Sequence, residues 1–174
     1  MNNIATFEKV SLKQFISDFY KLNPDLPNTD RTNDALQSVW EGIKLPTRAD
    51  GGSAGYDFYA PVEFDLNPGD IVTIPTGIRC KMNEGWVLML FPRSSLGFKY
   101  GFALLNTVGV IDQSYYGAIN EGHIMTKVQN NGCDLLKIGE HDRFVQGIFV
   151  PYGITTDDAP IAGTRVGGMG SSGK

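Results

Sequence analysis

Residues 67–91 read NPGDIVTIPTGIRCKMNEGWVLMLF, and this stretch decides the fold class. Three short runs with strand-like composition, DIVTIP, GIRCKM and WVLMLF, are separated by turn signals built from Asn, Pro and Gly. The second run has the period of a half-buried strand, because Arg79 and Lys81 alternate with apolar side chains at Ile78, Cys80 and Met82. The third run is apolar throughout, which predicts a strand covered on both faces.

The same pattern continues along most of the chain. From Leu45 onward, Pro, Gly and Asn-Gly signals recur between short β-rich runs, and the later runs are HIMTKV and RFVQGIFVPY. Many short strands at this spacing are typical of a sandwich or barrel. We therefore expect a mainly β domain over residues 45–162.

A different pattern occupies the N-terminal residues 1–44. Ser11 followed by Gln14 indicates a capping box, and an apolar stripe then predicts a helix from Ser11 to Leu22. After Pro24 and Pro27 the helical spacing returns. The stripes consist of Leu12, Phe15, Ile16 and Phe19, then of Leu36, Val39, Trp40 and Ile43. These residues predict a helical N-terminal extension.

Composition narrows the class of protein. The chain has 174 residues, of which 41% are hydrophobic, so one domain can bury a substantial core. Its net charge of −4 and its dispersed Lys and Arg argue against a nucleic-acid-binding surface. The N-terminus lacks a basic region followed by an apolar core, and no apolar run approaches a membrane span of roughly 20 residues. We expect a cytoplasmic protein without membrane contact.

The cysteines and histidines do not predict a metal site. Cys80 and Cys133 lack C-x-x-C spacing, and neither His123 nor His141 is near a Cys pair. We expect two buried or idle thiols in a reducing cytosol.

Three polar segments stand where a β core would use apolar residues. Asp57 lies between aromatic residues in SAGYDFYA, and Arg93 with two serines follows the most apolar run. Arg, Ser and main-chain N–H groups together bind phosphate oxygens. Asp112 ends an apolar hairpin segment, VGVID, where a carboxylate can serve as a general base. Taken singly, each segment also fits a plain turn or solvated loop.

The last residues, GGMGSSGK, match the P-loop spacing G-x-x-x-x-G-K. A P-loop needs a strand before it, a helix behind it, and Ser or Thr after the lysine, but Lys174 is the last residue of this sequence. We expect instead that residues 163–174 form a flexible glycine-rich lid, which wraps closely around phosphates.

Five segments in order carry a family resemblance: SAGYDF, PRSSLGFKYG, GVIDQSYYG, RFVQGIFVPY and GGMGSSG. They resemble the sequential motifs of trimeric dUTP diphosphatases (dUTPases), from about Leu45 to the end. The resemblance implies a jelly-roll-like β-clip subunit and a homotrimer whose active sites are shared between subunits. It also implies hydrolysis of dUTP to dUMP and pyrophosphate with Mg²⁺, by attack of water on the α-phosphorus.

The resemblance also implies roles for single residues. Asp112 would orient and deprotonate the attacking water, and Gln146 would lie near the α-phosphate. Asp57 and Arg143 would support the site and the waters on Mg²⁺, which the triphosphate itself would hold without a direct protein ligand. The residues implied to contact the phosphates are Arg93, Ser94, Ser95 and Arg165.

Further residues would contact the nucleoside or close the lid. The hairpin residues Asn106, Val110 and Ile111 would read uracil, and Tyr115 would pack under the deoxyribose. Met169 stands where an aromatic ring usually covers the base, and a thioether can cover a ring face as well. The lid residues beside it are Gly170 and Ser171.

Two alternatives share this fold. A dCTP deaminase needs a glutamate on the strand before the turn NNG, where this sequence has Val128. A non-catalytic nucleotide-binding regulator would use the N-terminal extension for docking.

Overall fold

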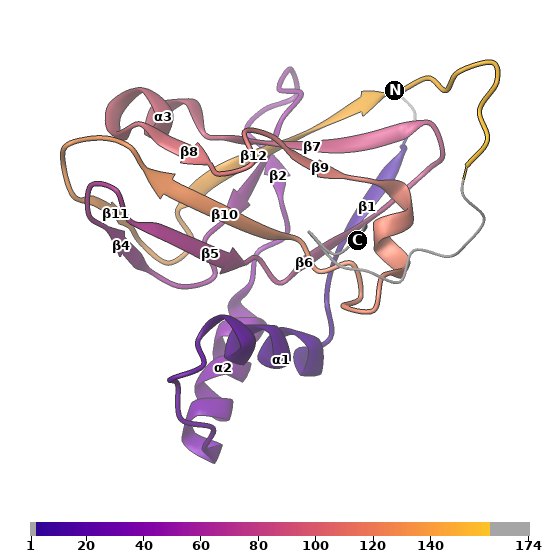
Figure 1. Cartoon of the computed structure of the whole chain (residues 1–174). Helices are drawn as coiled ribbons and strands as arrows, with labels where there is room; N and C mark the ends of the chain where they lie inside the picture. Colours follow the sequence, from indigo (N-terminus) through magenta and orange to yellow (C-terminus); the bar gives the residue numbers. More distant parts are fainter. Residues whose placement is uncertain (1–2, 161–174) are drawn as a thin grey trace.

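The structure is a computed structural model, and it describes residues 3–160. Antiparallel sheets form the body of the molecule (Figure 1). Within this range, the largest sheet has the order β2-β3-β12-β7-β9, and the others are β5-β10-β8, β1-β6 and β4-β11. The strands are β1 (Ala5–Lys9), β2 (Thr47–Arg48), β3 (Tyr56–Tyr59), β4 (Phe64–Leu66), β5 (Ile71–Pro75), β6 (Ile78–Met82), β7 (Trp86–Pro92), β8 (Phe102–Leu104), β9 (Gly109–Ile111), β10 (Met125–Asn130), β11 (Leu136–Ile138) and β12 (Arg143–Pro151). The sheets pack as a sandwich, which confirms the mainly β prediction.

The three strands predicted from residues 67–91 are present as β5, β6 and β7. In β6 the residues Ile78, Cys80 and Met82 are buried and Lys81 is exposed, so the predicted alternation is confirmed. In β7 only Leu88 and Leu90 are fully buried, while the alternate apolar residues are half-buried. The prediction that both faces are covered is therefore only partly correct within one chain.

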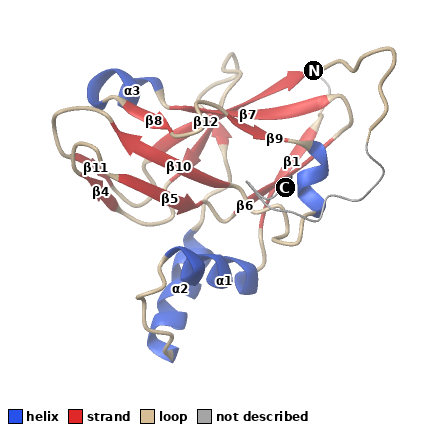
Figure 2. Ribbon diagram, viewed as in Figure 1, coloured by secondary structure: helices blue, strands red, loops and turns tan. Residues whose placement is uncertain are grey.

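The N-terminal segment is not purely helical, contrary to the sequence prediction. β1 pairs antiparallel with β6, so residues 5–9 belong to the β body. The helices α1 (Leu12–Leu22) and α2 (Asp30–Gly42) follow β1 and form a hairpin that projects from the sheets (Figure 2). The hairpin is thus inserted between β1 and β2 rather than attached ahead of the domain.

The predicted helix start at Ser11 is confirmed, but its capping box is only half formed. The Ser11 hydroxyl accepts a hydrogen bond from the Gln14 backbone N–H at 3.1 Å. The Gln14 side chain does not return to Ser11 and donates instead to Asp18 at 2.7 Å. Its place at the Ser11 backbone N–H is taken by the Glu121 carboxylate, at 2.7 Å.

The hairpin packs on the β body through Phe15 and Ile43, which are 0% and 7% exposed. Gly77 lies beneath them in the turn between β5 and β6, with φ +73°. A β-carbon at this glycine would collide with Ile43. The docking therefore requires glycine at this position, both for its backbone conformation and for space.

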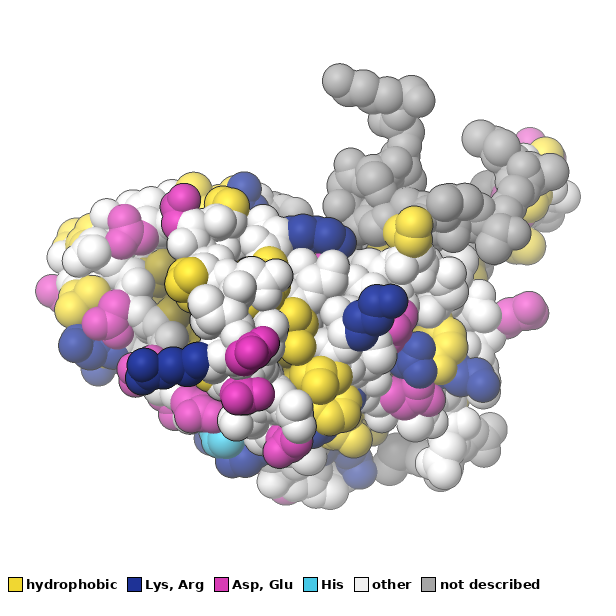
Figure 3. Space-filling model, turned by 90° about the horizontal axis from the view of Figure 1, so that it is seen from below, with side chains coloured by type: hydrophobic (Ala, Val, Ile, Leu, Met, Phe, Trp, Pro, Cys, Tyr) yellow, Lys and Arg dark blue, Asp and Glu magenta, His cyan; other side chains and the backbone are white. Residues whose placement is uncertain are grey.

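Charges of both signs are dispersed over the face of the molecule seen in Figure 3. On the face seen in Figure 3, Lys and Arg side chains lie among Asp and Glu and do not gather into a basic patch. In the described part of the chain, no helix is long and apolar enough to span a bilayer.

Candidate active site

Three of the predicted site residues meet on neighbouring strands. β12 lies between β3 and β7, and its register places Gln146 opposite Asp57 on one side and Phe91 on the other. A bulge in β12 follows Arg143, and bulges re-aim side chains. Arg143 Nη1 donates to Asp57 Oδ2 at 3.1 Å. The sheet therefore brings Asp57, Arg143 and Gln146 together.

Gly55 supports this group, although sequence reasoning gave it no role. The residue is buried directly before β3, and a β-carbon there would collide with the Gln146 side chain. Any other residue at this position would displace Gln146. The glycine stands inside the SAGYDF motif, so the signal was present in the sequence.

The predicted phosphate-binding residues lie where β7 ends. Arg93 is the N-cap of the short helix α3 (Ser94–Tyr100), which the sequence did not predict. Ser94 and Ser95 are exposed in its first turn, and Arg93 is half-buried. Arg93 and Arg143 line one polar cavity of about 330 Å³. Two guanidinium groups and two hydroxyls thus gather at this end of the sheet.

Asp112 follows β9 directly and is exposed. It lines a second cavity, of about 450 Å³, together with Val87, Val110 and Tyr152. The 3₁₀ helix η1 (Gln113–Gly117) begins after it, where the Tyr115 backbone N–H donates to the Asp112 carbonyl oxygen at 3.0 Å. The carboxylate is therefore presented at the start of a rigid turn.

The predicted base-binding hairpin joins β8 to β9. Asn106 is exposed at its tip, and Val110 is 52% exposed whereas Ile111 is 2% exposed. The side chains of Asn106 and Val110 are therefore accessible to a bound base. The buried Ile111 could contact a base only through its backbone N–H and C=O groups.

Tyr115 lies deeper than a ligand-contacting ring would suggest, with 2% of its surface exposed. Its hydroxyl donates to the His123 carbonyl oxygen at 2.8 Å and accepts from Asn120 Nδ2 at 2.8 Å. These bonds fix η1 from inside. The predicted contact between Tyr115 and a deoxyribose stays a prediction.

The next residue, Tyr116, fixes η1 from the other side. Its hydroxyl donates to Glu8 Oε2 at 2.9 Å, and Arg79 Nη2 pairs with the same oxygen at 2.8 Å. The hydrogen bond to Glu8 raises the pKa of Tyr116 above its usual value. Because Glu8 lies on β1 and Arg79 on β6, η1 is attached to that sheet.

The two halves of the predicted site stand at opposite ends of β7. The pairing of Leu88 with Ile111 puts Asp112 beside Val87, whereas Arg93 follows the far end of the strand. Six residues of strand span roughly 20 Å. Figure 1 shows α3 and the helical turn after β9 on opposite sides of the molecule. One chain therefore does not bring Asp112 to Arg93 or Gln146.

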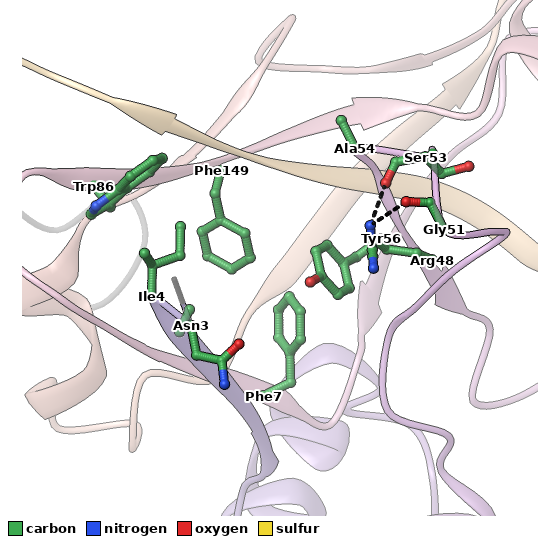
Figure 4. Close-up of a pocket in the computed structure, with 12 residues that line it drawn as sticks. Asn3, Ile4, Phe7, Arg48, Gly51, Ser53, Ala54, Tyr56, Trp86 and Phe149 are labelled. Carbon is green, nitrogen blue, oxygen red and sulfur yellow. Dashed lines mark hydrogen bonds between the residues drawn. The ribbon is translucent and has the colours of Figure 1, made fainter. Parts of the chain in front are cut away.

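A separate cavity of about 440 Å³ holds none of the predicted site residues. Figure 4 shows the rings of Phe7, Tyr56 and Phe149 turned toward one another in it, with Trp86 further along. The guanidinium of Arg48 is used within its own loop, where it donates to two backbone carbonyl oxygens, both at 3.2 Å. A cavity lined by aromatic rings, whose arginine is already hydrogen-bonded within its own loop, does not suit a triphosphate.

One buried oxygen bears on metal binding. Asp57 Oδ1 has no hydrogen-bond partner within the described chain, although Asp57 is 3% exposed. Buried polar atoms need a partner, and a water on a phosphate-bound Mg²⁺ would donate to this oxygen. Among residues 3–160, no cluster of three His, Cys, Asp or Glu could hold an ion by itself. The residues present thus fit a magnesium ion held by substrate and water.

Four predicted site residues and the predicted lid, residues 163–174, lie outside the described residues. The four residues are Arg165, Met169, Gly170 and Ser171.

Fold and site together define a class of protein: a β-sandwich protein in which arginine and serine side chains suited to phosphate oxygens gather at one end of a sheet. Within that class, the chain belongs to the dUTPase family, whose model matches residues 41–173. The deoxyuridine 5'-triphosphate nucleotidohydrolase of Lactococcus lactis subsp. lactis (strain IL1403) is 40% identical over 134 residues, or 76% of this chain and 89% of that protein.

Solved structures agree with this assignment. The dUTPase from Streptococcus mutans superposes with a TM-score of 0.59 at 40% identity, covering 64% of this chain and 88% of that one. A mutant dUTPase from phage phi11 of S. aureus, which coordinates a structural Mg(II) ion, has a TM-score of 0.57 at 22% identity and covers 70% and 91%. At that identity the phage protein supports the fold alone. The predicted family, fold class and enzyme class are confirmed.

Proposed function

We propose that this protein hydrolyses dUTP to dUMP and pyrophosphate, with Asp112 as the general base for water attack on the α-phosphorus. The observation that carries this proposal is the position of Asp112, an exposed carboxylate between the base-binding hairpin and a fixed helical turn. A base held beside the nucleotide can take the proton from water as it attacks. Such a group contributes about 10²–10⁴ in rate.

Cationic and hydroxyl groups at the other end of β7 bind the triphosphate. Arg93 neutralises phosphate oxygens, Ser94 and Ser95 donate from the exposed first turn of α3, and Gln146 reaches the α-phosphate. Asp57 holds Arg143 at 3.1 Å and thereby fixes this end of β12. When bound with the nucleotide, Mg²⁺ supplies charge neutralisation and ordered waters, for which Asp57 Oδ1 is an acceptor.

Uracil recognition is assigned to the hairpin between β8 and β9. Cytosine presents a donor where uracil presents its O4 acceptor, and each buried polar group left unpaired costs about 1–3 kcal/mol. The exposed Asn106 and the backbone at Val110 and Ile111 supply the polar groups for this discrimination. Deamination of dCTP receives no support, because Val128 is 0% exposed in the core.

We further propose that the active site is assembled between subunits of a homotrimer. The support is the separation of roughly 20 Å along β7 between Asp112 and Arg93. Both residues are proposed to act on the phosphates of one nucleotide, and that separation is too long for both to do so from the same chain. A closed ring of three chains places one end of β7 against the other end in a neighbour. The predicted lid residues and the expected cytoplasmic location stay predictions.

Pyrophosphate release tests the proposed activity directly. The purified protein is assayed with dUTP, dCTP, dTTP and UTP in parallel, and ammonia release from dCTP is followed separately. We expect turnover of dUTP with strong discrimination against the other three. A protein that binds dUTP without releasing pyrophosphate would instead support the regulatory alternative.

A further inference from the structure

The inserted helix α1 contacts the segment directly behind the catalytic turn. Asp18 lies on the inner face of α1 and is 2% exposed. Its Oδ2 atom lies 2.8 Å from His123 Nδ1, although the two residues are 105 positions apart. Neither residue has a part in the proposed chemistry, so their buried contact calls for another explanation.

His123 joins three parts of the molecule. Its Nε2 accepts a hydrogen bond from the Gly77 backbone N–H at 2.8 Å, in the turn between β5 and β6. An accepting Nε2 carries no proton, so Nδ1 carries it and donates to Asp18. The His123 carbonyl oxygen accepts from the Tyr115 hydroxyl at 2.8 Å. One buried residue thus connects α1, the β body and η1.

From Tyr115 the connection reaches Asp112 in one step. The Tyr115 backbone N–H donates to the Asp112 carbonyl oxygen at 3.0 Å, which forms the first turn of η1. Asn120 Nδ2 donates to the Tyr115 hydroxyl at 2.8 Å and closes the loop. A shift of His123 therefore moves the ring that fixes the orientation of the catalytic turn.

A second contact from the insertion holds the same loop. The Ser11 backbone N–H and hydroxyl donate to the two oxygens of Glu121, at 2.7 and 2.6 Å. Although partial burial opposes ionisation, these bonds lower the pKa of Glu121 below its usual value. The insertion thus contacts residues 121 and 123 independently, from its cap and from its inner face.

Asp18 is ionised in this arrangement. Burial opposes its charge, but hydrogen bonds from His123, Gln14 and Lys21 lower its pKa below the usual value. Loss of the Asp18 carboxylate would leave the Nδ1–H of His123, whose side chain is 0% exposed, buried without a partner.

We infer that Asp18 is a positioning residue for dUTP hydrolysis: through His123 and Tyr115, the inserted helix holds the turn that presents Asp112. This inference rests on the proposed role of Asp112 as the base. It gives the insertion a function inside the enzyme. A displacement of about 1 Å at a reacting group can cost 10²-fold in rate, so a remote anchor can control turnover.

The test compares Asp18→Ala, Asp18→Asn and Tyr20→Phe. Asp18→Ala leaves the His123 Nδ1–H without its acceptor, and we expect kcat for dUTP to fall at least about tenfold while KM changes by less than about threefold. Asp18→Asn keeps an oxygen acceptor and restores kcat to within about twofold of the wild type. Tyr20→Phe removes the 3.0 Å bond between Tyr20 and Asn33 inside the hairpin and serves as the control, with unchanged kcat.

A further variant covers the case in which Asp18→Ala does not fold. Ser11→Ala removes one of the two Glu121 contacts, and we expect a kcat about threefold to tenfold lower, with faster amide exchange in residues 113–124. If Asp18→Ala folds and has the kcat of the wild type, the inference is overturned. If Asp18→Ala does not fold, a wild-type kcat in Ser11→Ala overturns it instead. A change in KM alone in these variants, or an equal loss of kcat in Tyr20→Phe, would also overturn it.

Asp112→Asn, assayed in parallel, distinguishes the positioning role of Asp18 from the proposed role of Asp112 as the base. If Asp112→Asn is inactive and Asp18→Ala turns over dUTP like the wild type, only the positioning role fails. If Asp112→Asn keeps full activity, both the proposed mechanism and the positioning role fail.

Discussion

At the scale of single residues, Asp112 has two properties that a general base needs. Its side chain is exposed toward a cavity of about 450 Å³, and its backbone is fixed by the first turn of η1. Exposure gives access to water, and the fixed backbone sets the position from which the carboxylate projects. Substitution of this residue should therefore affect the chemical step and not substrate binding.

Asp112→Asn tests that role. We expect kcat to fall about 10²–10⁴-fold with little change in KM, because the amide keeps the shape and loses the basicity. Steady-state pyrophosphate release at saturating dUTP measures the effect. An unchanged kcat would contradict the general-base assignment.

The two thiols differ in environment and should differ in reactivity. Cys80 is 2% exposed, and burial raises its pKa to about 12. A group with a raised pKa stays a protonated thiol at pH 8, and the thiolate is the reactive form. Cys133 is exposed. Ellman titration at pH 8 should therefore detect one thiol per native chain and two after unfolding; two rapid thiols in the native protein would contradict the burial.

Candidate residues for the site are easier to name from the sequence than the residues that support them. Asp57, Arg93, Asp112 and Gln146 stand in ordered motifs and could be named from the sequence alone. The Asp18–His123 contact could not, because it joins residues 105 positions apart and neither lies in a recognisable motif. Long-range pairs of this kind are set by tertiary packing.

Among the elements, the inserted hairpin shows what local patterns reveal and what they miss. The apolar stripe and Ser11 placed α1 nearly correctly, because a helix carries its signal in consecutive residues. β1 was missed, since its five residues pair with β6, far along the chain, and carry no strand signal of their own. The seven-residue α3 was missed because its sequence was interpreted as a phosphate-binding loop.

Phe15→Ala tests how strongly α1 is docked. Phe15 is 0% exposed, so its truncation should lower the free energy of unfolding by about 3–5 kcal/mol, as expected for a buried phenylalanine. Phe98→Ala is the matched control, since Phe98 is 94% exposed and its loss should cost less than about 0.5 kcal/mol. Urea unfolding followed by circular dichroism gives both values. Equal effects in the two variants would contradict the docking described for α1.

At the scale of the whole molecule, the structure divides the predicted site into two groups. Arg93, Gln146, Asp57 and Arg143 lie at one end of β7 and β12, whereas Asp112 lies at the other end. The half-buried apolar residues on the second face of β7 also leave apolar surface that one chain does not cover. Both features fit a subunit whose active site is completed by a neighbour.

Subunit complementation tests this account most directly. Arg93→Ala and Asp112→Asn chains, each inactive alone, are refolded together, and mixed assemblies are isolated through two different tags. In a mixed trimer, one site of the three joins an intact Arg93 from one chain to an intact Asp112 from another, so the isolated mixed trimers should recover about a third of wild-type activity. Mixed trimers that stay as inactive as their parents would show that Arg93 and Asp112 act within one chain, and would contradict the shared site.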